Sequence, residues 1–211
     1  MIVSGMIEQE QVKELTDDLA DFVKYCDLNI DKKFRREVIH AMVFPTFRRY
    51  TWTSRRKNKW TVIYEARSKK EVGDYARITN YATVDIGFGK YAYMPSFVEG
   101  KLHFIIYPPH FFSRFNERCG LDRTGQSLYD RFFRDNGSYC FDLKERHIMK
   151  DDKEFLCTEV YGSTKDGVAM GVLTNEGNVL FRTFVTYDML KGDQIETFTK
   201  NEQIRREIHD N

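Results

Sequence analysis

The sequence predicts an α+β fold, in which helices come first and an antiparallel β-meander of about four strands follows, with additional strands before it. Apolar residues repeat at helical spacing between residues 6 and 42, and again between residues 109 and 136. After Gly137 the pattern changes to short runs of strand-forming residues, which are separated by turn sequences rich in Gly, Asn and Asp. Short connections of this kind join neighbouring strands in antiparallel order.

The first 45 residues are expected to form a helical arm. Residues 6–25 carry Val12, Leu15 and Leu19 at helical spacing, with Glu and Asp between them. A turn is predicted over residues 27–31, and a second helix over residues 32–42, which ends before Pro45. The apolar stripe of these helices has two explanations, packing on the parent domain or a homo-oligomer interface.

Residues 46–211 are predicted to form one compact α+β domain. Strands are expected at 60–66, 75–81, 82–88 and 102–107. A helix over 109–119 has a proline at its start and Gly120 at its end, and a second helix runs from the N-cap Thr124 to residue 136. The meander strands are 138–143, 155–161, 167–173 and 178–187, and residues 188–209 are expected to be helical, with an interruption near Gly192.

The composition limits the classes of protein to which this chain can belong. Its 211 residues are 41% hydrophobic and 15% aromatic, which is enough for a core, and no apolar run approaches the roughly 18–20 residues of a membrane span. The first ten residues lack the basic and apolar regions of a secretory signal, so a cytoplasmic location is expected. The cysteines are far apart and form no CxxC pair, which favours free thiols and gives little support to a zinc site. No other metal or cofactor is expected, because His103, His110 and His147 lack the spacing of metal ligands.

Basic and aromatic residues alternate in the segment 48–70, where Glu65 is the single acid. Lys and Arg can contact phosphates, and Tyr or Trp rings can stack on bases, so this segment is a candidate nucleic-acid surface. Its alternative is a twisted edge hairpin whose charges prevent pairing with another sheet edge. The candidate nucleic-acid-binding residues are Arg48, Arg49, Tyr50, Trp52, Arg55, Arg56, Lys57 and Lys59.

The predicted helix over 109–119 has one apolar face and one polar face. The polar face carries His110, Ser113, Arg114, Glu117 and Arg118. Histidine can move a proton near neutral pH, and arginine can contact phosphate oxygens bidentately, so this face suits metal-independent cleavage of RNA. Glu117 is either a second proton carrier or a partner that orients the arginines. The alternative for the whole group is an ordinary solvated helix face.

Two helices followed by a four-stranded antiparallel meander resemble the barnase, EndoU, colicin and RelE-like nuclease superfamily. The sequence His110-x3-Arg114-x2-Glu117-Arg118 is similar to the first helix of its toxin-like and phage-associated members, and the likeness covers roughly residues 102–190. It implies a metal-independent endoribonuclease that acts on RNA and has an inhibitor or antitoxin-like protein as partner. With a polar residue from the last strand, the candidate catalytic residues are His110, Arg114, Glu117, Arg118, Arg182, Thr183 and Thr186. Residues 1–100 have no counterpart in the compact toxins.

Two functions remain open from the sequence. The first is a metal-independent ribonuclease-like domain that cleaves RNA by attack of the 2′-hydroxyl on phosphate. The alternative is a non-catalytic α+β module that binds nucleic acid or protein. Catalysis requires His110 to act together with a polar group of the last strand, whereas a binding module requires only the positive surface.

Overall fold

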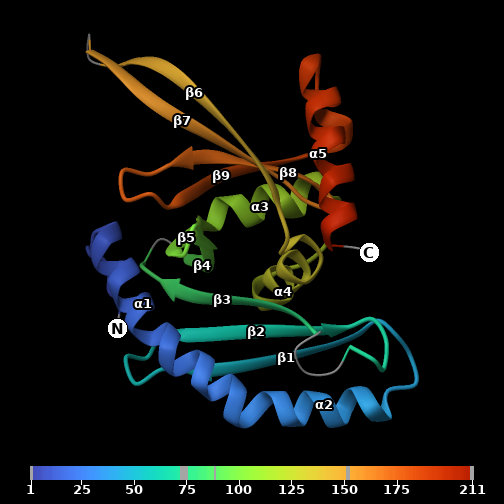
Figure 1. Ribbon diagram of the computed structural model, residues 1–211. Helices are drawn as coiled ribbons and strands as arrows, with labels where there is room; N and C mark the ends of the chain where they lie inside the picture. Colours follow the sequence, from blue (N-terminus) through green and yellow to red (C-terminus); the bar gives the residue numbers. More distant parts are fainter. Residues whose placement is uncertain (1, 72–75, 88, 151–152, 210–211) are drawn as a thin grey trace. The chain divides into compact units, whose positions relative to one another are not determined.

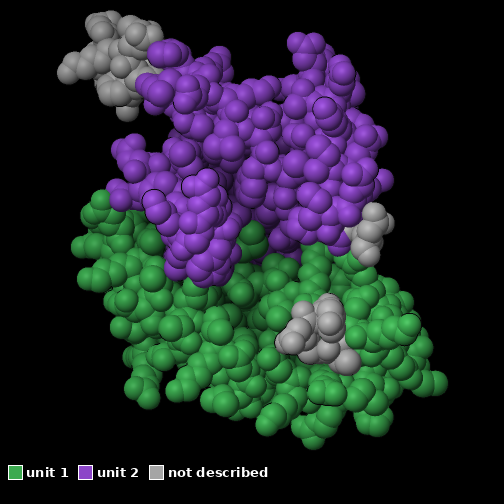
Figure 2. Space-filling view, in the orientation of Figure 1, with its two compact units in different colours: residues 1–94 green, residues 95–211 purple. Residues whose placement is uncertain are grey.

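The computed structural model describes residues 2–71, 76–87, 89–150 and 153–209. It confirms the α+β class, and the described residues form nine strands, more than the meander of about four strands that was predicted with additional strands before it. Residues 75 and 88, where two predicted strands begin and end, lie outside the described residues. The chain groups into two compact units, residues 1–94 and 95–211 (Figure 2).

Unit 1 begins with two helices, α1 (Glu8–Tyr25) and α2 (Asp31–His40), close to the predicted positions. The turn predicted over residues 27–31 is wrong, because a π-helical turn, η1 (Cys26–Ile30), joins α1 to α2. Cys26 and Ile30 are both buried, so the apolar stripe continues through this turn. The amide of Asn29 also donates a hydrogen bond to the carbonyl of Tyr25 at 3.0 Å, which helps to hold the helical path.

The strands of unit 1 are β1 (Thr46–Thr53), β2 (Lys59–Ala66), β3 (Arg77–Asp85) and β4 (Lys90–Val98), of which β4 continues beyond Met94 into unit 2. Each pairs antiparallel with the next, and β3 replaces the two strands predicted on either side of residue 81. Helices α1 and α2 lie along one face of β1 and β2 (Figure 1). There Phe22 stacks on Trp60 at 4.9 Å between ring centroids, and Phe34 contacts Tyr64 at 5.0 Å.

The strands of unit 2 are β5 (Lys101–Tyr107), β6 (Cys140–Lys150), β7 (Lys153–Ser163), β8 (Gly167–Leu173) and β9 (Val179–Thr186). Their order across the sheet is β5-β9-β8-β7-β6. Strands β6 to β9 form an antiparallel meander, and β5 joins it by parallel pairing, with Ile105 opposite Val179. Strands β6 and β7 are both longer than predicted.

Helices α3 (Pro109–Arg118) and α4 (Gly125–Asn136) cover one face of this sheet. Phe111 of α3 is fully buried, and its ring contacts the rings of Phe132, Phe181 and Phe184. The opposite face packs against α5 (Asp193–His209), whose Phe198 joins a buried cluster with Val168. A short 3₁₀ turn, η2 (Tyr187–Met189), leads from β9 toward α5.

A β-bulge in β9 decides which of its side chains face α3. Met170 pairs with Thr183 but Gly171 pairs with Phe181, so Arg182 is an extra residue on β9. The expected alternation of side chains is therefore interrupted, and Phe181 and Phe184 are both buried. Gly171 permits this close pairing, because a Cβ atom there would lie 2.1 Å from the carbonyl oxygen of Leu180.

Candidate functional site

The polar face of α3 is exposed, as its predicted helical spacing requires. His110, Ser113, Arg114 and Glu117 are exposed, whereas the phenylalanines of the same helix are buried. Arg114 Nη1 lies 2.9 Å from Glu117 Oε2, so Glu117 pairs with this arginine one turn away. The helix therefore presents an imidazole beside a partly neutralised guanidinium.

Arg118 connects the end of α3 to the last strand. Its Nη1 donates to Thr183 Oγ1 at 3.1 Å and also to the backbone carbonyl of Phe184. Thr183 is thus the last-strand candidate that meets the helix. Arg182, the bulge residue, is exposed, and Thr186 pairs with Gly167 at the far end of the strand. Among the described residues, neither of them forms a hydrogen bond or an ion pair with the polar side chains of α3.

Half of the candidate nucleic-acid-binding residues contact the helices of unit 1. Arg48 Nε lies 2.5 Å from Glu37 Oε2, and the guanidinium of Arg56 lies within 3.4 Å of the carboxylates of Asp17 and Asp18. The two aromatic candidates, Tyr50 and Trp52, also contact these helices. Lys33 Nζ of α2 lies 5.2 Å from the centroid of the Tyr50 ring. Trp52 packs on the rings of Phe22 and Tyr25.

The other four candidates are exposed cations at the edge of unit 1: Arg49, Arg55, Lys57 and Lys59. Strand β1 lies at the end of the strand order, and the connection from β1 to β2 carries Arg55 and Lys57. Such charges at a sheet edge oppose pairing with another strand, as the edge-hairpin interpretation expects.

A basic groove between α2 and β1 was not predicted from the sequence. It has a volume of about 460 Å³ and is lined by Lys33, Arg36, Glu37, His40 and Arg48. Residues 33, 36, 37 and 40 follow helical spacing, so they share one face of α2. That spacing was visible in the sequence, but the approach of Arg48 from β1 depends on the fold.

Cys119 is the half-buried C-cap residue of α3, and burial raises the pKa of its thiol to about 11. A thiol with such a pKa is almost entirely protonated at neutral pH and is a poor nucleophile. All four cysteines are free, as expected from their spacing. Within the described residues, no group of three or more His, Cys, Asp or Glu side chains is placed to hold a metal ion.

The described helices include none with the length and apolar character that crossing a membrane requires. No protein-family model, curated protein or solved structure matches this chain.

Proposed function

We propose that unit 2 is a ribonuclease-like module that cleaves RNA without a metal ion. The observation that carries this proposal is the arrangement of α3. This helix presents His110 and Arg114 on an exposed face, while Arg118 attaches the helix to Thr183 of the last strand. The two helices before an antiparallel meander give the same order of elements as the nuclease superfamily that the sequence resembles. We also propose a cytoplasmic location, and the resemblance implies an inhibitor or antitoxin-like protein that restrains cleavage.

The proposed chemistry assigns one role to each side chain on this face. His110 takes the proton from the ribose 2′-hydroxyl, whose oxygen then attacks the adjacent phosphorus. The bond from phosphorus to the 5′-oxygen breaks as that oxygen takes a proton from water, and a 2′,3′-cyclic phosphate remains. Arg114 leaves Glu117 to contact the phosphate oxygens, where negative charge accumulates in the transition state. Arg118 is a positioning residue, because its guanidinium is bonded to β9.

The basic groove of unit 1 favours a second candidate, a module that binds RNA without cleaving it. Lys33, Arg36 and Arg48 line this groove with His40, and Glu37 is its acidic member. Cations in a groove attract a polyanion whatever its sequence. The binding weakens as salt rises, because the release of counterions from the polyanion then gains less entropy. This function makes no demand on His110.

The deciding experiment is cleavage of an end-labelled single-stranded RNA in excess EDTA. We compare the parent protein with His110→Ala and with the matched control His147→Ala, which removes another exposed histidine from β6. Loss of a general base lowers rates by roughly 10²–10⁴-fold. We expect that loss for His110→Ala alone, with a cyclic phosphate as the product of the parent protein.

A filter-binding assay at rising salt separates the second candidate from the first. Retention of RNA without cleavage, reduced by Arg36→Ala and unchanged by His110→Ala, would support the binding module and refute the nuclease. Equal cleavage by the parent protein and His110→Ala would also refute the proposed site. Neither cleavage nor retention would refute both candidates and leave α3 with an ordinary solvated face.

A further inference from the structure

Unit 2 contains an apolar pocket that lies on the same sheet face as α3 and α4. Its volume is about 330 Å³, and its lining residues come from β5 to β9, the end of β4 and the turn before β9. Ile105, Val160 and Val179 form its buried or half-buried part. The pocket is largely apolar and falls in the size range of small-molecule sites.

The pocket exists because α3 and α4 cover only part of the sheet. Phe181 and Phe184 of β9 are buried beneath the helices, but the side chains around the pocket remain partly open to solvent. Leu143 is 56% exposed and Leu173 is 38% exposed, although both belong to the pocket lining. A concave apolar surface that stays in contact with water gains free energy when an apolar ligand covers it.

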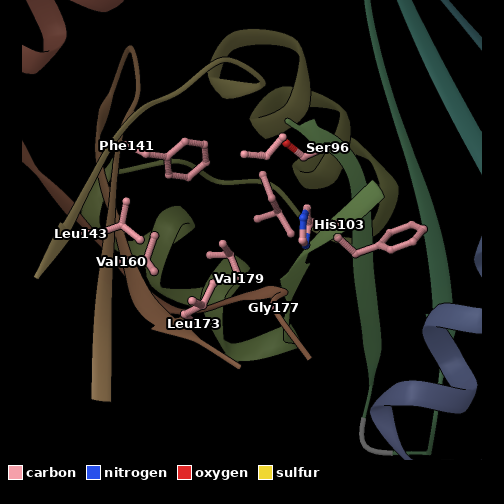
Figure 3. Close-up of a pocket in the computed structure, with 11 residues that line it drawn as sticks. Ser96, His103, Phe141, Leu143, Val160, Leu173, Gly177 and Val179 are labelled. Carbon is pink, nitrogen blue, oxygen red and sulfur yellow. The ribbon is translucent and has the colours of Figure 1, made fainter. Parts of the chain in front are cut away.

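Two polar side chains interrupt this lining on one side. Ser96 and His103 lie across the pocket from Phe141, Leu143 and Val160 (Figure 3). A hydroxyl and an imidazole can both donate hydrogen bonds, and an imidazole can also carry a positive charge. The pocket is therefore apolar over almost all of its surface, and its few polar atoms lie on one side, which we call the polar wall.

The polar wall is held in place by the turn between β8 and β9. Asn178 Oδ1 accepts a hydrogen bond of 2.8 Å from the backbone N–H of Phe104, next to His103 on β5. Gly177 has a φ of +78°, and a Cβ atom there would lie 3.4 Å from the ring of His103. Glycine thus satisfies the turn geometry and leaves space for the imidazole beside it. The site is formed before a ligand arrives.

We propose that this pocket binds a small monocarboxylic acid with a compact apolar tail. The carboxylate would accept hydrogen bonds from His103 and Ser96, and the tail would cover Leu143, Val160 and Leu173. The volume of about 330 Å³ is about twice the roughly 150 Å³ that suffices for a benzene ring. It therefore suits a tail of about eight carbon atoms. This inference is independent of the proposed action on RNA.

The test is titration of the whole protein with octanoate and with 1-octanol, followed by NMR of the Val and Leu methyl groups. A ligand of about ten heavy atoms that is held mainly by its apolar tail is expected to bind in the millimolar range. Leu173→Trp places a bulky ring at the pocket, whereas Leu156→Trp makes the same change at an exposed β7 residue outside the lining. We expect octanoate binding to weaken at least tenfold in the first variant and to be unchanged in the second.

His103→Ala tests the polar wall separately from the apolar body. We expect octanoate to bind about five- to tenfold more weakly to this variant, with 1-octanol affected less than twofold. Equal affinity of the parent protein for both ligands would overturn the assignment of a carboxylate. Absence of saturable shifts, or equal binding by the parent protein and Leu173→Trp, would overturn the pocket itself. Unchanged methyl spectra away from the pocket show that each variant is folded.

Discussion

Replacing Arg118 with methionine removes the hydrogen bonds that join α3 to β9 and keeps a long side chain in their place. Arg118 Nη1 donates to Thr183 Oγ1 at 3.1 Å and to the carbonyl of Phe184. Hydrogen bonds to charged groups contribute about 1.5–3 kcal/mol each, and partial exposure of this guanidinium reduces each contribution to about 1 kcal/mol. We expect Arg118→Met to lower the free energy of opening of α3 and β9 by about 2 kcal/mol.

Thr183→Val provides the matched partner in a double-mutant cycle. It removes the hydroxyl acceptor but leaves the bond from Arg118 to the Phe184 carbonyl, so we expect a loss of about 1 kcal/mol. The hydrogen bond between the two side chains can be lost only once. The double variant should therefore lose about 2 kcal/mol rather than 3, which corresponds to a coupling energy of about 1 kcal/mol.

Hydrogen exchange measured on peptides from α3 and β9 reports these energies locally. A loss of about 2 kcal/mol accelerates exchange through opening roughly 30-fold. Trp52 and Trp60 both belong to unit 1, so their fluorescence serves as a control for that unit. Additive effects of the two substitutions would refute the assigned contact. If the exchange rate in Arg118→Met changes less than threefold, this arginine does not hold α3 against β9. Arg118 would then again be a candidate catalytic residue.

Two further predictions concern the core of unit 2 and the buried thiols. Phe111→Ala should lower the free energy of unfolding by about 3–5 kcal/mol, because this fully buried ring contacts several others. Phe111→Leu should lower it by much less. Urea unfolding followed by circular dichroism measures both losses, and a loss below 1 kcal/mol for the alanine variant would contradict the packing. Burial raises the pKa of Cys119 to about 11 and that of Cys26 to about 12, from an ordinary value of 9.0. At pH 8 the thiolate fractions should fall roughly 100-fold and 1000-fold, so a thiol reagent should modify both slowly in the folded protein and rapidly in guanidinium. Because the pKa values of both thiols are raised in the folded protein, the contribution of the two thiols to stability is complete below pH 9.0 and decreases as pH rises toward 11 and 12. Equally fast modification of the folded and unfolded protein would contradict the burial of these thiols.

The helices and turns of this protein are largely determined by local sequence. The apolar residues of α1, α2, α3 and α4 follow the helical period, and the helix over 109–119 was predicted within one residue of its observed bounds, Pro109–Arg118. The turn at residues 174–178 depends on Gly177, whose positive φ is a property of glycine rather than of the fold. These features could be predicted because hydrogen bonds and steric effects between near neighbours produce them.

The tertiary structure determines which residues the polar side chains of those elements contact. Strand β4 was missed because its pairing with β3, rather than its own pattern, stabilises it. The contact of Arg118 with Thr183 depends on a bulge whose partner, Gly171, belongs to another strand. Arg48 and Arg56 were predicted to contact nucleic acid, and the folded chain pairs them with acids from α2 and α1. These contacts join segments that are far apart in the chain and come together only on folding. Local periodicity therefore cannot predict which side chains will pair.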